Sequence, residues 1–199
     1  MRYVEVDGLR SSVIGLGTWQ FGSREWGYGE AYATEIAPAL VRRALELGIT
    51  MLDTAEVYGP GRSERIVGAA LAEVPPAARD GLVTATKFLP IAPTEAILAR
   101  QAAGSRRRLG VDALDLYYAH WPNPLVSVRR TMQALRPLVA EGVVRRVGIR
   151  GVGPVPAVCA GAAELDHRVA PGVVREDADG DAAAGGGGDD EVGGVGLEP

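Results

Sequence analysis

Four ionisable side chains follow consecutive apolar segments of this chain: Asp53, Tyr58, Lys87 and His120. Taken singly, each has an ordinary explanation: Asp53 as a strand-end cap, Tyr58 as a core aromatic, Lys87 as a salt-bridge partner, and His120 as a core histidine. If the apolar segments are parallel strands, however, their carboxyl ends share one face, where barrel enzymes place their active sites. Four such residues on successive elements therefore predict one site.

The chemistry that these four side chains predict is proton donation to a carbonyl oxygen. A phenol has a reference pKa of about 10, which is too high for efficient acid catalysis at neutral pH. An adjacent ammonium stabilises the phenolate and lowers that pKa, and a carboxylate holds the ammonium in place. An imidazole can orient the carbonyl or relay a proton. Without a metal-ligand cluster, this set favours carbonyl reduction by hydride delivery, while a Schiff base on Lys87 remains an alternative.

Lys87 is the only lysine among 21 basic residues, and the others are arginines. Arginine does not replace lysine where chemistry needs a compact charge with an adjustable pKa. The survival of one lysine at the end of an apolar segment therefore supports a functional interpretation of that position.

Apolar runs and turn residues predict an alternation of strands and helices. The predicted strands are residues 4–6 and 9–13, joined by an Asp7-Gly8 turn, and then 14–18, 49–53, 82–87, 114–120 and 143–149. The first predicted helix has Pro38 near its first turn and ends just before Gly48. The others run from a Ser63 cap to about Ala72, from Pro93 to a stop at Gly110, and from about Ser127 to Glu141 with a kink at Pro137. Such alternation predicts a parallel sheet, either doubly wound or a (β/α)₈ barrel. No G-x-G-x-x-G follows the first strand, which argues against a Rossmann nucleotide site.

Composition divides the chain into two parts, at residues 1–150 and 151–199. In the second part 39 of 49 residues are Gly, Ala, Val, Asp or Glu, with ten acidic and two basic side chains, so we predict a disordered acidic tail. All five of these residue types are encoded by codons that begin with G, and one hypothesis is an out-of-frame or degraded 3′ end of a GC-rich gene.

Bulk properties restrict the cellular setting and the partners. Cys159 is the only cysteine, no apolar run is long enough to span a membrane, and the first residues form no secretory signal. We therefore expect a cytoplasmic protein. No basic stripe tracks a phosphodiester backbone, so we expect neither nucleic acid nor membrane as a partner.

Several sequence strings resemble the signatures of the aldo-keto reductase superfamily. They are GITMLDTAEVYG at 48–59 followed by SE at 63–64, GLGTW at 15–19, TK at 86–87, DLY at 115–117 with HWP at 120–122, and GVVRRVGI at 142–149. The resemblance covers residues 10 to 149. It implies a (β/α)₈ TIM barrel that binds NADPH and reduces a small-molecule carbonyl substrate.

The resemblance also implies a role for each site residue. Tyr58 would be the general acid, Lys87 its partner, Asp53 the counter-ion of Lys87, and His120 the group that orients the substrate. Thr18 and Asp53 would approach the nicotinamide, and Trp19 and Trp121 would line the substrate pocket. No metal is implied.

The sequence departs from the family after the last predicted strand. The family continues there with a Ser-Asn pair that binds the nicotinamide carboxamide, whereas this chain has Arg150 and Gly151. We therefore expect a partial barrel, with an N-terminal hairpin, about five strands and the tail. Such a chain would bind NADPH weakly and show little turnover. A non-catalytic fragment or binding module is the alternative, with self-association through open sheet edges.

Overall fold

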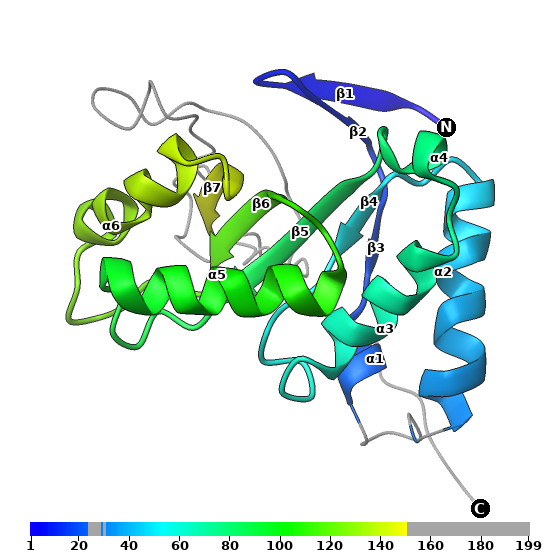
Figure 1. Ribbon diagram of the computed structural model, residues 1–199, viewed down its shortest axis with the longest axis horizontal. Helices are drawn as coiled ribbons and strands as arrows, with labels where there is room; N and C mark the ends of the chain where they lie inside the picture. The colour runs from blue at the N-terminus through cyan, green and yellow to red at the C-terminus, as the bar shows by residue number, and fades with distance from the viewer. Residues whose placement is uncertain (24–28, 30, 151–199) are drawn as a thin grey trace, which may run out of the picture.

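The computed structural model describes residues 1–23, 29 and 31–150. The predicted tail at 151–199 lies outside the described residues. Within them, the predicted parallel α/β arrangement is confirmed (Figure 1).

The sheet consists of five parallel strands that follow one another in chain order. They are β3 (Gly15–Gly17), β4 (Met51–Asp53), β5 (Val83–Phe88), β6 (Leu114–Ala119) and β7 (Val144–Ile149), each hydrogen-bonded to the next. A doubly wound sheet reverses its strand order at a switch point, and this sheet does not. The order is that of consecutive strands in a barrel wall.

An antiparallel hairpin precedes the sheet. It is formed by β1 (Tyr3–Val6) and β2 (Leu9–Ser12), and its turn residues Asp7 and Gly8 both have positive φ, as a tight hairpin turn requires. The guanidinium of Arg146, on β7, contacts the carboxylate and the carbonyl oxygen of Asp7. The hairpin is thereby joined to the last strand of the sheet.

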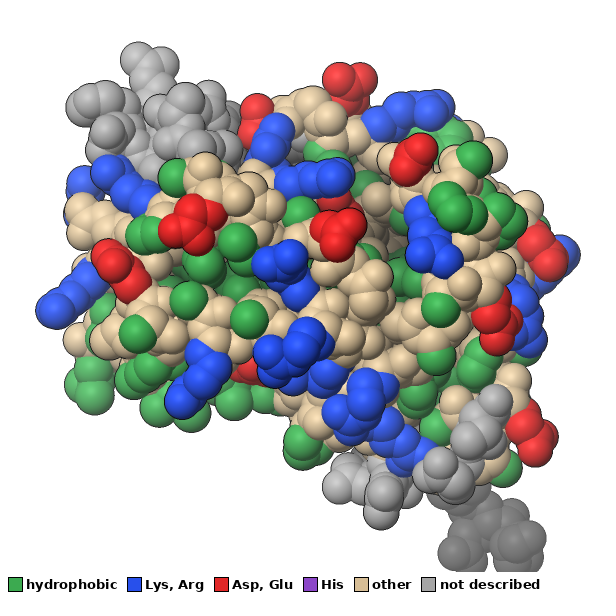
Figure 2. All heavy atoms as spheres, viewed as in Figure 1, with side chains coloured by type: hydrophobic (Ala, Val, Ile, Leu, Met, Phe, Trp, Pro, Cys, Tyr) green, Lys and Arg blue, Asp and Glu red, His purple; other side chains and the backbone are tan. Residues whose placement is uncertain are grey.

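Helices cover one face of the sheet (Figure 1). They are α1 (Trp19–Gly22), the π-helix η1 (Tyr32–Ile36), α2 (Ala37–Glu46), α3 (Arg62–Ala72), α4 (Pro76–Arg79), α5 (Glu95–Leu109) and α6 (Val128–Ala140). The main core lies between these helices and the sheet and includes Leu52, Val67, Phe88, Leu98 and Leu135, all at most 1% exposed. Figure 2 shows arginine side chains spread over the outer face of the helices, where they meet solvent. No helix of the described part has the length and apolarity needed to cross a membrane.

One local expectation about the helices is wrong. Ser63 does not cap α3: Gly61 occupies the N-cap position with a left-handed backbone, and Ser63 lies inside the first turn with its hydroxyl bonded elsewhere. The helix expected from about Ser127 to Glu141 is confirmed as α6, with Pro137 inside it, and the kink at Pro137 stays a prediction.

Candidate functional site

A cavity of about 420 Å³ opens at the carboxyl ends of the strands. Its lining comprises Trp19, Gly22, Ser23, Val57, Tyr58, Gly59, His120 and Trp121. Four of the predicted site residues therefore share one cavity although they come from three separate segments: Trp19 from α1, Tyr58 from the loop after β4, and His120 and Trp121 from the loop after β6. Trp19 and Trp121 remain 49% and 44% exposed, so each presents an accessible aromatic surface.

Lys87 lies just behind Tyr58 and joins it to Asp53. The Lys87 ammonium forms an ion pair with the Asp53 carboxylate, donates to the Thr54 carbonyl oxygen at 3.0 Å, and lies 3.5 Å from the Tyr58 hydroxyl. Its side chain is 4% exposed, against 27% for Asp53. The ammonium therefore has three acceptors, which hold it in one position beside Tyr58.

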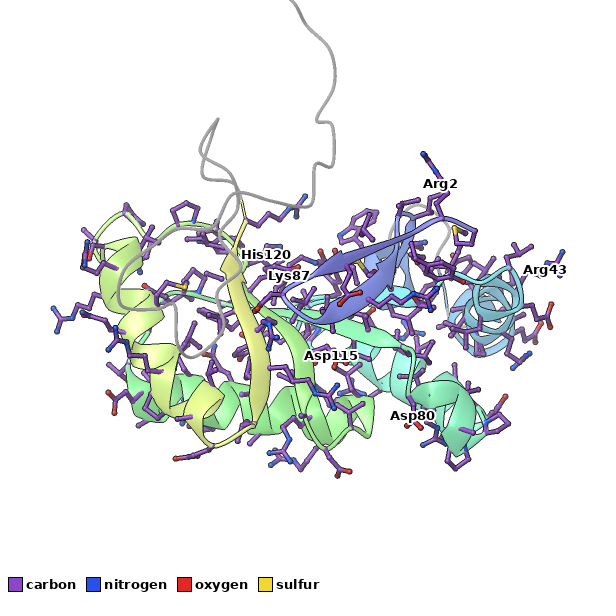
Figure 3. All side chains as sticks on the ribbon, turned by 90° about the horizontal axis from the view of Figure 1, so that it is seen from above. Arg2, Arg43, Asp80, Lys87, Asp115 and His120 are labelled. Atoms are coloured by element: carbon purple, nitrogen blue, oxygen red, sulfur yellow. The ribbon has the colours of Figure 1, made fainter. Side chains whose placement is uncertain are left out.

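His120 completes the set from the next strand. Figure 3 shows Lys87 and His120 close together at the centre of the molecule, from β5 and from the end of β6. The His120 ring meets the Tyr58 ring edge-on, with centroids 5.7 Å apart and an interplanar angle of 84°. Burial, followed by the charges of Lys87 and Arg150, lowers the pKa of His120 to about 4. The imidazole is therefore uncharged at neutral pH and can donate one hydrogen bond and accept another.

The shifted pKa of His120 predicts a distinctive titration. The chain has two histidines, and NMR of their ring protons should show His120 titrating with a midpoint near 4, well below the usual 6.5. Because the unfolded chain binds this proton more readily, folding stability should fall as pH drops from about 6.5 towards 4. His167→Gln assigns the two signals, and a midpoint near the usual value for His120 would contradict its desolvated placement.

Thr18, like Asp53 and Lys87, is a predicted site residue that does not line the cavity. Its side chain is fully buried, and its hydroxyl lies 2.9 Å from the Asp53 carbonyl oxygen and 2.8 Å from the Ser63 hydroxyl. The Thr18 amide also donates to the Asp53 carbonyl, at 2.9 Å. The structure thus places Thr18 under the end of β4, and its contact with a cofactor stays a prediction.

Glu56 secures the loop that carries Tyr58, a role that the sequence did not reveal. Its carboxylate accepts hydrogen bonds from the Leu89 amide at 2.7 Å and from the Gln101 side chain at 2.8 Å. Burial raises its pKa above the usual value, an effect that the hydrogen bond from Leu89 opposes. The Tyr58 loop is therefore fastened both to the end of β5 and to α5.

The backbone of the Tyr58 loop also crosses α1 at a pair of glycines. A Cβ on Gly22 would lie 2.2 Å from the Tyr58 carbonyl carbon, and a Cβ on Gly59 would lie 2.2 Å from the Gly22 oxygen. Gly59 additionally has a φ of +60°. Only glycine permits this approach, and both glycines line the cavity.

We expect Gly22→Ala to destabilise the protein by about 1–3 kcal/mol or more, because the new methyl group meets rigid backbone. Urea unfolding followed by far-UV circular dichroism measures this loss. Gly81→Ala is the matched control, since a Cβ there has no neighbour within 4 Å. Equal stabilities for the two variants would show that the crossing is looser than the structure indicates.

Comparisons with known proteins place the chain in a family. The model of the aldo/keto reductase family matches residues 13–170. The uncharacterized oxidoreductase Rv2298 of Mycobacterium tuberculosis is 47% identical over 150 residues, which are 75% of this chain and 45% of the relative. The aldo-keto reductase YhdN of Bacillus subtilis is 38% identical over 159 residues, covering 75% of this chain and 46% of that protein.

Solved structures agree with the sequence comparisons. An aldo-keto reductase from Klebsiella pneumoniae in complex with NADPH superposes with a TM-score of 0.59 at 35% identity, over 70% of this chain and 45% of that one. The chain spans about half the length of the curated relatives it matches. The family match, the parallel strand order and the convergence of Asp53, Tyr58, Lys87 and His120 agree, and the chain belongs to the aldo/keto reductase family.

Proposed function

We propose that this chain carries the carbonyl-reducing centre of an NADPH-dependent aldo-keto reductase. The observation that carries the proposal is the position of Lys87, in contact with both the Asp53 carboxylate and the Tyr58 hydroxyl. Tyr58 and His120 line the same cavity, so a substrate there meets the acid and the orienting group together. The only cysteine of the chain accords with a cytoplasmic location, which we propose as well.

A nicotinamide cofactor fits the chemistry of this set of donors. The set holds a proton donor and a fixed cation, and no cluster of three metal-ligating side chains occurs among residues 1–23, 29 and 31–150. When bound, NADPH supplies the hydride that reduces the carbonyl carbon. Asp53, partly exposed at the end of β4, is a described residue that would help to hold the nicotinamide. The relative from Klebsiella pneumoniae that holds NADPH supports this choice of cofactor.

Each residue of the site then has a separate role in the proton transfer. Tyr58 donates its hydroxyl proton to the carbonyl oxygen, which becomes the hydroxyl of the product alcohol. The adjacent Lys87 ammonium stabilises the Tyr58 phenolate that remains, until a proton from solvent converts it back to the phenol. Asp53 holds the ammonium in place, and the neutral imidazole of His120 orients the carbonyl oxygen.

Carbonyl-dependent oxidation of NADPH tests the proposal. Because we expect weak NADPH binding and little turnover, the purified chain is used at high concentration with excess NADPH and a panel of aldehydes and ketones, and the loss of NADPH absorbance is followed. Consumption that requires both the carbonyl and Tyr58 supports reduction. Borohydride trapping of a carbonyl compound on Lys87, without NADPH consumption, would favour the Schiff-base alternative instead.

We also propose self-association through the outer strands. Among the described strands of the sheet, β3 and β7 each pair on one side only, and Val13 and Ile14 beside β3 are 43% and 56% exposed. Unpaired edges with apolar flanks promote association. Sedimentation velocity should show oligomers that grow with concentration, and Ile14→Lys should reduce them. A single monomeric species at all concentrations would contradict this proposal.

A further inference from the structure

Ser63 and Glu64, at the start of α3, lie outside the cavity but form hydrogen bonds with the residues next to Trp19, Asp53 and Lys87 in the chain. The two side chains are fully buried, which is unusual for a serine and a glutamate in the first turn of a helix. Neither of them caps the helix. Their hydrogen bonds therefore serve another purpose.

Ser63 joins three segments that end at the cavity. Its hydroxyl donates to the Thr18 carbonyl oxygen at 2.7 Å and accepts from the Thr54 hydroxyl at 2.9 Å. Its backbone amide donates to the Tyr58 carbonyl oxygen at 3.2 Å. Thr18 directly precedes Trp19, and Thr54 directly follows Asp53, so one residue fixes the backbone of both positions and that of Tyr58.

Glu64 makes the corresponding contact to the strand of Lys87. One carboxylate oxygen accepts from the Thr86 hydroxyl at 2.6 Å, and the other pairs with the Arg108 guanidinium at 2.5 Å. Thr86 directly precedes Lys87 and is fully buried. Adjacent residues of a strand point to opposite faces of the sheet. The hydrogen bond from Thr86 to Glu64, on the face covered by helices, therefore fixes the backbone from which Lys87 extends on the other face.

We propose that Ser63 and Glu64 are positioning residues that set the geometry of Asp53, Lys87 and Tyr58. Ser63 fixes the end of β4, with the Thr54 carbonyl that receives Lys87, and Glu64 fixes the end of β5. The relative position of two adjacent residues in one helical turn thereby determines the separation between carboxylate and ammonium. The effect of this positioning on catalysis rests on the proposed function. A displacement of the site residues by about 1 Å lowers the reaction rate only if Tyr58 transfers a proton.

The single lysine provides a probe that does not depend on turnover. A full chain labelled with ¹⁵N at the lysine side chain has one such NMR signal, that of Lys87. Since its three hydrogens are bonded and its side chain is 4% exposed, they should exchange slowly with solvent. Ser63→Ala and Glu64→Gln should each accelerate that exchange about tenfold or more, as local opening becomes easier.

Paired threonine variants make the test more specific. Thr54→Val and Thr86→Val remove the bonded hydroxyls with little change of shape and should reproduce the faster exchange. Thr54→Ser and Thr86→Ser keep the hydroxyls and should retain slow exchange. If Ser63→Ala or Glu64→Gln does not fold, these four variants decide the question alone.

Ser127→Ala controls for stability, because it removes the hydroxyl that caps α6 at 3.3 Å from the Arg130 amide, and no residue of α6 lines the cavity. It should lower the melting temperature without changing the Lys87 signal. The proposal would be overturned if the Thr→Val and Thr→Ser variants had the same rate of Lys87 hydrogen exchange. It would also be overturned if Ser127→Ala accelerated that exchange as much as Ser63→Ala or Glu64→Gln. If the variants changed the Lys87 exchange rate as expected but the parent chain consumed no NADPH, only the proposed function would be contradicted.

Discussion

Replacing Tyr58 by phenylalanine is expected to lower the turnover number for carbonyl reduction about 10²–10⁴-fold, the range that a positioned general acid contributes. The ring still fills its place in the cavity and still meets His120 edge-on, so only the proton donor is lost. The Michaelis constant for the carbonyl should change little, because the hydroxyl acts mainly in the transition state.

Steady-state consumption of NADPH with the best carbonyl of the panel measures both constants. Tyr3→Phe is the matched control. It removes a hydroxyl on the β1 strand of the hairpin that donates to the Gly48 carbonyl oxygen, and neither residue lines the cavity. We expect it to retain the parent turnover number. A Tyr58→Phe variant with unchanged turnover would assign the proton to another donor.

The sequence predicted the parallel sheet and the convergence of the site because both depend on simple periodicity. Apolar runs separated by helical patterns require parallel strands, and parallel strands bring Asp53, Lys87 and His120 to one edge of the sheet. The short elements α1, η1 and α4 were not predicted. Each has five residues or fewer, too few to show a period.

The contacts that hold the site residues in place could not be predicted, for a different reason. Ser63 was interpreted as a cap because serine favours that position, yet its hydroxyl bonds to Thr18 and Thr54. The crossing of Gly22 and Gly59 likewise depends on two segments that only the folded chain brings together. The one available signal was the Ser-Glu pair within the family-like string, which marked the positions without revealing their contacts.

Lys87→Arg is expected to lower the turnover number by about 10²-fold or more, although it conserves the charge. The lysine ammonium fits among Asp53, Thr54 and Tyr58 with only 3% of the residue exposed. A guanidinium is larger and planar, and it carries five donors, so it cannot occupy this space without moving Tyr58. Overpacking of this kind should also reduce the free energy of unfolding by about 1–3 kcal/mol.

Turnover and urea unfolding, measured together, separate the loss of chemistry from the loss of stability. Arg42→Lys is the reciprocal control at an exposed ion pair with Glu73 and should leave both quantities nearly unchanged. Lys87→Met, which removes the charge and leaves Asp53 without its cation, should lose at least as much turnover. If Lys87→Arg kept the parent turnover while Lys87→Met lost it, charge alone would suffice at this position, and the compactness of the ammonium would not explain why this chain retains a single lysine.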